Sequence, residues 1–159
     1  MGGYLARLLG GLILACTLLP VGAATDLPLA VDLPSEVRQA ALAKAPLIVI
    51  FSRKDCKYCE TVKRDYLLPL LTNPAYADKV VVRQINQDGV QALLDFKGRQ
   101  TTHARFAAGE KIKLVPVVAF YGPDGRKLAD RIIGARLPDF YNLYLQDAIE
   151  QSAQMLEKP

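Results

Sequence analysis

Residues 47–59 have the sequence Leu47-Ile48-Val49-Ile50-Phe51-Ser52-Arg53-Lys54-Asp55-Cys56-Lys57-Tyr58-Cys59. The five apolar residues at the start of this segment predict a buried strand. From Cys56 onward the apolar side chains follow a helical spacing, so Cys56 is expected at a helix N-terminus and Cys59 one turn further on. A strand that delivers a Cys-x-x-Cys pair to a helix N-terminus is typical of proteins that exchange disulfides.

The position of Cys56 predicts a reactive thiolate. Free backbone N–H groups and the positive end of the helix dipole favour negative charge there, and Arg53, Lys54 and Lys57 add positive charge nearby. We therefore expect a lowered pKa for Cys56, which would attack disulfides as the nucleophile. Cys59 is expected to be more buried and to resolve the mixed disulfide from one turn away.

Two neighbours of the cysteines have other expected roles. Asp55 opposes the positive charges around Cys56, but its side chain is also suited to cap the helix. Tyr58 lies between the two cysteines and is therefore expected at the surface that meets the substrate.

The first 23 residues predict a signal peptide that is removed. Arg7 is the charged residue of a short N-terminal region, residues 8–19 are apolar, and small residues follow at 21–23. A retained membrane anchor is the alternative, although the apolar stretch is short for a spanning helix of about 20 residues. Lipidation of Cys16 is a second alternative. Export predicts a periplasmic location, which is oxidising.

Cleavage of the signal would leave Cys56 and Cys59 as the only cysteines of the mature chain. A disulfide between them closes a very small loop and would constrain the unfolded chain little, so the pair is better suited to chemistry than to stabilisation. With His103 as the only histidine, the chain lacks four ligands for structural zinc, and we expect no metal and no cofactor beyond the redox-active disulfide. His103 itself is expected to be a surface or internally hydrogen-bonded residue.

Composition and charge suit one globular domain. The chain has 159 residues, of which 51% are hydrophobic and 23% are charged, enough for a core that folds alone. The net charge is +4 and the basic residues are scattered, so no nucleic-acid partner is expected. The basic segment 97–113 is either a solvated face or a docking surface for an acidic partner.

The pattern along the rest of the chain alternates helices and strands before a final hairpin and helix. Pro69 is expected to end or kink the helix that starts at Cys56. The other predicted elements are helices at 35–45, 90–96, 102–108 and from Pro138, and strands at 47–51, 80–85, 115–121 and 126–133. This order predicts an α/β fold with a mixed sheet and helices on both faces.

Three segments resemble the thioredoxin-fold family. They are Phe51-Ser52-Arg53-Lys54-Asp55-Cys56-Lys57-Tyr58-Cys59-Glu60, Val115-Pro116-Val117-Val118-Ala119-Phe120-Tyr121-Gly122-Pro123-Asp124-Gly125-Arg126-Lys127 and Ile132-Ile133-Gly134. The chain is most similar to exported bacterial members, namely periplasmic thioredoxin-like proteins associated with sulfur oxidation and the C-terminal domain of the transmembrane disulfide reductase.

The resemblance implies a three-layer α/β/α sandwich over residues 35–152. The sequence on either side predicts an extended lead-in at 24–34 and a frayed tail at 153–159. It also implies a cis bond between Val115 and Pro116, beside the cysteine pair. In such proteins the backbone of the residue before this proline pairs with an extended substrate segment, a role that would fall to Val115.

The chain departs from thioredoxin itself at three points. Lys57-Tyr58 replaces Gly-Pro between the cysteines, no Trp precedes Cys56, and Ile50 stands where thioredoxin has a buried acid. The usual proton acceptor for Cys59 is therefore missing, with Glu60 or water as possible substitutes, and the direction of electron flow is left open.

The leading functional hypothesis is a periplasmic thiol–disulfide oxidoreductase, acting as a reductase on partner-protein disulfides. We expect a monomer that receives electrons from a membrane or periplasmic donor. A disulfide oxidase or isomerase is one alternative. A protein that holds Cu(I) with Cys56 and Cys59 is another.

Overall fold

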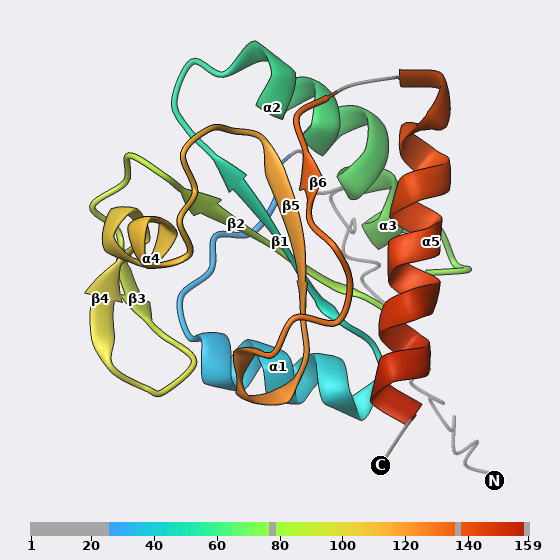
Figure 1. Cartoon of the computed structure of the whole chain (residues 1–159), viewed down its shortest axis with the longest axis horizontal. Helices are drawn as coiled ribbons and strands as arrows, with labels where there is room; N and C mark the ends of the chain where they lie inside the picture. Colours follow the sequence, from blue (N-terminus) through green and yellow to red (C-terminus); the bar gives the residue numbers. More distant parts are fainter. Residues whose placement is uncertain (1–25, 77–78, 136–137, 158–159) are drawn as a thin grey trace, which may run out of the picture.

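The computed structural model describes residues 26–76, 79–135 and 138–157 of the chain. Its main sheet has the strand order β2-β1-β5-β6, and β3 and β4 form a second, two-stranded sheet (Figure 1). The elements in chain order are α1 (Leu33–Leu42), β1 (Leu47–Ser52), α2 (Lys57–Val62), the π-helix η1 (Lys63–Leu67), α3 (Leu68–Thr72), β2 (Val81–Asn86), β3 (Ala92–Leu94), β4 (Gln100–Thr102), α4 (His103–Gly109), β5 (Val117–Tyr121), the 3-10 helix η2 (Pro123–Gly125), β6 (Ile132–Ile133) and α5 (Pro138–Glu157).

The main sheet is mixed, as predicted. β1 pairs with β2 in parallel, whereas β5 is antiparallel to both β1 and β6. In this register Phe51 near the end of β1 lies opposite Val117 at the start of β5. The loop that carries the cysteines and the loop that carries Pro116 therefore meet at the same end of the sheet.

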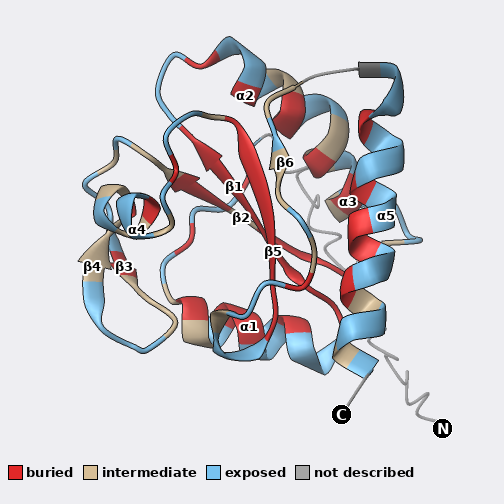
Figure 2. Cartoon of the chain, in the orientation of Figure 1, coloured by how far each residue is buried: buried red, intermediate tan, exposed pale blue. Residues whose placement is uncertain are grey.

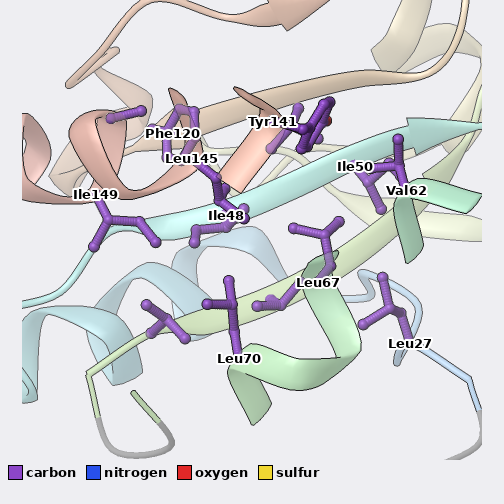
Figure 3. Close-up of a cluster of buried hydrophobic side chains, with 14 of the residues drawn as sticks. Leu27, Ile48, Ile50, Val62, Leu67, Leu70, Phe120, Tyr141, Leu145 and Ile149 are labelled. Carbon is purple, nitrogen blue, oxygen red and sulfur yellow. The ribbon is translucent and has the colours of Figure 1, made fainter. Parts of the chain in front are cut away.

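Alternation along β1 creates the three layers. One face of the sheet packs against α1 and α4 through Leu47, Val49 and Phe51. The opposite face carries Ile48 and Ile50. The second face is covered by α2, α3 and α5, as Figure 3 shows for the labelled residues Leu27, Ile48, Ile50, Val62, Leu67, Leu70, Phe120, Tyr141, Leu145 and Ile149. Figure 2 shows β1, β2 and β5 buried between the helices. The fold is the predicted α/β/α sandwich.

The segment before α1 is extended and lies along β2. Ala30 donates a backbone hydrogen bond to Gln84 O, and Gln84 N donates to Pro28 O, both at 2.9 Å. The Asp32 side chain then caps α1 by accepting from Ser35 N at 2.9 Å. α1 thus begins two residues before the predicted start, inside the expected lead-in.

The helix that follows the cysteines passes through Pro69 without ending there. Pro69 cannot donate the helical hydrogen bond to residue 65. The chain adapts by forming η1, where Leu68 N–H bonds to Lys63 O five residues back, and the helix then continues as α3 to Thr72.

The prediction of a short helix at 90–96 was wrong. Residues Ala92–Leu94 form β3, paired with β4 through a turn at Gly98 that has φ 72°. Leu94 N also donates to Val31 O at 2.9 Å, so the lead-in segment stabilises the extended conformation from far away in the sequence.

The last helix is longer than expected. α5 continues to Glu157, although the sequence predicted a frayed tail from residue 153. In the described ranges 26–76, 79–135 and 138–157, no helix is both long and apolar enough to cross a membrane. The predicted signal peptide and Cys16 lie outside these ranges.

Candidate functional site

The cysteine pair lies where the chain leaves β1 and enters α2 (Figure 1). Cys56 is the N-cap of α2, and its Sγ accepts a hydrogen bond from Cys59 N at 3.2 Å. Asp55 is therefore not the helix cap. It has φ 58°, a left-handed conformation that turns the chain from the strand into the helix. Cys56 and Cys59 form a disulfide with a Cα–Cα distance of 5.2 Å.

Burial distinguishes the two cysteines. Cys56 is 7% exposed and Cys59 is fully buried. Cys56 also lines an open surface hollow of about 410 Å³, together with Asp55, Lys57 and Glu60. An incoming sulfur can therefore reach Cys56 before Cys59. The roles of Cys56 as nucleophile and Cys59 as resolving cysteine stay predictions.

The three cations predicted to tune Cys56 have exposed side chains, and only Lys57 lines the hollow with Cys56. Arg53 and Lys54 lie in the loop before the N-cap, and Lys57 is the first residue of α2. Solvent and salt screen exposed charges, so the backbone N–H groups of the helix start are the more constant influence on the sulfur. The tuning role of these cations stays a prediction.

The loop before β5 completes this end of the sheet. The Val115–Pro116 bond is cis, Pro116 is buried and Val115 is half-buried. Gly134 N donates to Pro116 O at 2.8 Å, which joins the loop to the end of β6. The predicted substrate-binding residues thus lie at one end of the sheet; they are Tyr58, Val115 and Pro116.

Exposed apolar side chains occur at the same end. Tyr58 is 69% exposed, Leu114 is 54% exposed and Ile133 is 53% exposed. Ile133 lies opposite Val117 on β6, the edge strand. Apolar side chains that stay exposed around a reactive sulfur are suited to contact a protein substrate.

A polar cleft next to the loop that carries the cysteines was not predicted. It has a volume of about 500 Å³ and lies between the loop after β1, the start of the helix and β2. Its lining includes Glu60, Lys63, Gln84 and Asp88. Lys63 and Gln84 are buried, and Gln84 Oε1 has no hydrogen-bond partner. One signal was available in the sequence, because Lys63 follows Cys59 by four residues on the face predicted to be apolar.

His103 lies in the core rather than at this site. Asn86 N donates to His103 Nδ1 at 3.0 Å, which leaves Nε2 to donate to Ala30 O at 2.8 Å. Both ring nitrogens are occupied, so His103 is the internally hydrogen-bonded residue that was one of the two expectations. No group of three or more His, Cys, Asp or Glu side chains is placed to hold a metal in the part of the chain that the structure describes.

The model of the thioredoxin-like domain family matches residues 33–149. The chain belongs to this family. That span contains β1, the cysteine pair, Pro116 and most of α5, and so nearly all of the described fold. A thioredoxin-like domain with a Cys-x-x-Cys disulfide at the start of α2 makes the protein a thiol–disulfide oxidoreductase.

Solved structures show the same fold. Mitochondrial thioredoxin 3 of Saccharomyces cerevisiae is 21% identical, with 78% of this chain and 93% of that chain covered at a TM-score of 0.50. Thioredoxin O1 of Arabidopsis thaliana is 18% identical, with 77% and 97% covered at 0.51. A thioredoxin-fold protein of Helicobacter pylori is 14% identical, with 70% and 73% covered at 0.51. A comparison with curated proteins found no match.

Proposed function

We propose that this thioredoxin-like protein reduces disulfides of partner proteins in the periplasm. The observation that carries the proposal is the position of Cys56, which caps α2, lines an open hollow and is bonded to the fully buried Cys59. Thioredoxin-fold proteins act on protein thiols, and the exposed apolar side chains around Cys56 suit a protein substrate.

The proposed reaction uses the two sulfurs in turn. The Cys56 thiolate attacks one sulfur of a substrate disulfide, forms a mixed disulfide and releases the other substrate sulfur as a thiolate. Cys59 then loses its proton and attacks Cys56 Sγ, which breaks the mixed disulfide and releases the second substrate sulfur. The substrate gains two electrons and two protons in total, and the protein is left with the Cys56–Cys59 disulfide.

The substrate is proposed to bind as an extended segment across the Val115–Pro116 loop. Its backbone would pair with the backbone of Val115 next to the edge of the sheet, and its side chains would contact Tyr58 and Ile133. The protein acts as a monomer and is reduced again by a membrane or periplasmic donor of electrons.

Export is proposed from the sequence pattern of residues 1–23. The mature protein recovered from a periplasmic extract is expected to begin at or near residue 24, which an intact mass measures. A mature protein that retains residues 1–23, or a mass increased by lipid on Cys16, would replace this part of the proposal with an anchored form.

The roles of the sulfurs can be tested with two single variants. Cys56→Ser is expected to abolish disulfide reduction, because no other sulfur lies at the helix N-cap. Cys59→Ser is expected to accumulate a mixed disulfide with its substrate, which non-reducing electrophoresis detects. The double variant with both serines is the control and should trap nothing. Reduction at the wild-type rate by Cys56→Ser would refute the mechanism.

The direction of electron flow is tested by the reduction potential. Equilibration with glutathione is expected to give a value near that of thioredoxin, about −270 mV. A value near about −120 mV would instead indicate an oxidase.

A further inference from the structure

Lys63 is a buried cation one helical turn beyond the resolving cysteine. Its side chain is 7% exposed, whereas the carboxylates that pair with it are much more exposed, 61% for Glu60 and 76% for Asp26. The Lys63 Nζ lies 2.6 Å from Glu60 Oε1 and 3.9 Å from Asp26 Oδ1. A lysine is seldom buried this deeply, because removing an ammonium group from water costs free energy.

The helix places Lys63 over Cys59. Lys63 N–H donates to the carbonyls of Cys59 and Glu60, so the turn between residues 59 and 63 is helical. Side chains four residues apart on a helix lie on one face, with Cβ atoms about 5–6 Å apart. Long helical side chains also point toward the helix N-terminus. The Lys63 side chain therefore runs back across the turn that holds Cys59.

In the described residues, the side chains of β1 and β2 on the face toward α2 are uncharged, and Arg83 of β2 lies on the opposite face, paired with Glu36. Ile48 and Ile50 of β1 are fully buried in the apolar cluster on this face, and Figure 3 shows Ile50 close to Val62. The neighbouring strand β2 contributes Gln84, a neutral amide. This face of the sheet is therefore uncharged, and Lys63 is the buried charge that shares a helix with the resolving sulfur.

The other charged groups of this region are exposed. They are Asp26 in the lead-in, Arg53, Lys54 and Asp55 in the loop after β1, Lys57 and Glu60 on α2, and Asp88 after β2. Solvent screens their effect on a buried sulfur, whereas a buried charge is screened much less. Lys63 thus has the strongest electrostatic influence expected on Cys59.

We propose that Lys63 is a positioning residue that stabilises the thiolate of Cys59 in the resolving step, and that the negative charge of Glu60, paired with its ammonium group, partly offsets this effect. The Cys59 thiol gives up its proton to water as its thiolate forms. The thiolate then attacks Cys56 Sγ, forming the Cys56–Cys59 bond as the bond to the substrate sulfur breaks. This inference rests on the proposed roles of Cys56 and Cys59.

The test follows the reactions of the two sulfurs as two successive phases. Reduced protein is mixed with 5,5′-dithiobis(2-nitrobenzoate), whose coloured thiolate is released once when Cys56 attacks and again when Cys59 resolves. Stopped-flow absorbance across a pH series gives the pH dependence of each phase. Lys63→Met removes the charge and keeps a long side chain, whereas Lys63→Arg keeps the charge. Arg64→Met is the matched control, because Arg64 is an exposed cation on the same helix, paired with Asp65.

Lys63→Met is expected to raise the pH midpoint of the second phase by about one unit, which slows resolution at neutral pH up to about tenfold. The first phase should change less than about twofold. Lys63→Arg and Arg64→Met should keep the wild-type midpoint. Glu60→Gln should lower the midpoint, since it removes a negative charge. Opposite shifts from the two halves of one ion pair cannot come from a general loosening of the helix.

The outcomes separate the role of Lys63 from the role of Cys56. An unchanged second-phase midpoint in folded Lys63→Met, or equal shifts in both phases, would overturn the role of Lys63. If Lys63→Met does not fold, the pH midpoint of the second phase in Glu60→Gln decides. A midpoint that is unchanged or raised would then overturn the role of Lys63. Failure of Cys56→Ser to abolish the first phase would instead refute the assignment of the nucleophile.

Discussion

Two charged clusters in this molecule have opposite arrangements. In the Glu110 cluster (Glu110, Tyr121, Lys127 and Arg131), a mostly buried carboxylate accepts from Tyr121 and pairs with Lys127, and the backbone carbonyl of the same residue accepts from Arg131. In the Lys63 cluster (Asp26, Glu60 and Lys63), a buried cation is paired with exposed carboxylates. Only the second cluster lies one helical turn from a reactive sulfur.

The Glu110 cluster joins separate parts of the chain. Glu110 Oε2 accepts from Tyr121 OH at 2.8 Å and lies 3.1 Å from Lys127 Nζ, while Glu110 O accepts from Arg131 at 3.1 Å. Tyr121 is fully buried and pairs with Leu47, at the end of β1 away from the cysteines. These groups satisfy one another, which indicates a structural role.

The partners of a buried charge indicate whether it stabilises the fold or alters the reactivity of the site. A buried charge whose hydrogen-bond partners come from several elements holds those elements together. A buried charge with one close partner, four residues from a catalytic sulfur, is instead placed to alter that sulfur. The first kind should respond mainly in stability and the second mainly in reactivity.

The largest expected effect on stability is that of Glu110→Ala. This change leaves the hydroxyl of buried Tyr121 without its acceptor, and we expect a loss of about 2 kcal/mol in the free energy of unfolding. Urea denaturation measures it. Lys127→Met is the control and should cost less than about 1 kcal/mol, because Lys127 is half exposed.

A second change on the partner sharpens this prediction. Tyr121→Phe added to Glu110→Ala should recover part of the loss, since it removes the unpaired hydroxyl. If the double variant is less stable than Glu110→Ala by the full cost of Tyr121→Phe alone, the two groups are not coupled.

The next effect is a loss of stability at alkaline pH. Burial, followed by the charge and hydrogen bond of Glu110, raises the pKa of Tyr121 well above its usual value near 10. The unfolded chain therefore releases this proton first, and the stabilisation present below about pH 10 is lost as the pH rises further. The expected share of Tyr121 is about 1.4 kcal/mol for each pH unit above 10.

Urea denaturation of the oxidised protein between about pH 9 and 11 measures this slope. Tyr121→Phe should flatten it. Burial also raises the pKa of Tyr141, so Tyr141→Phe should flatten the slope as well. An identical slope in wild type and Tyr121→Phe would contradict the coupling of this phenol to folding.

The smallest expected effect is that of Lys63→Met on stability. Replacing a buried charge with an apolar side chain of similar length often changes stability little, because the desolvation cost is removed together with the ion pair. We expect a change within about 1 kcal/mol by urea denaturation, while the resolving step changes by up to about tenfold. A loss above about 3 kcal/mol would place Lys63 with the structural charges instead.

Local patterns predicted the site because its signals are short in sequence. The apolar run 47–51 followed by Cys56 and Cys59 indicated a strand, a helix start and a redox pair, and the structure has all three. The prediction of a helix at 90–96 failed because the extended conformation of this segment depends on a hydrogen bond to Val31, about sixty residues earlier. No local pattern contains that partner.

By itself, the sequence determined the order of the main elements, the fold class and the position of the two cysteines, because side-chain periodicity and helix-start chemistry act over a few residues. Tertiary structure alone decided that residues 92–94 would join a second sheet and that the Lys63 side chain would be buried. Each of these depends on which distant groups supply hydrogen bonds, charge or cover from solvent, and folding brings those groups together.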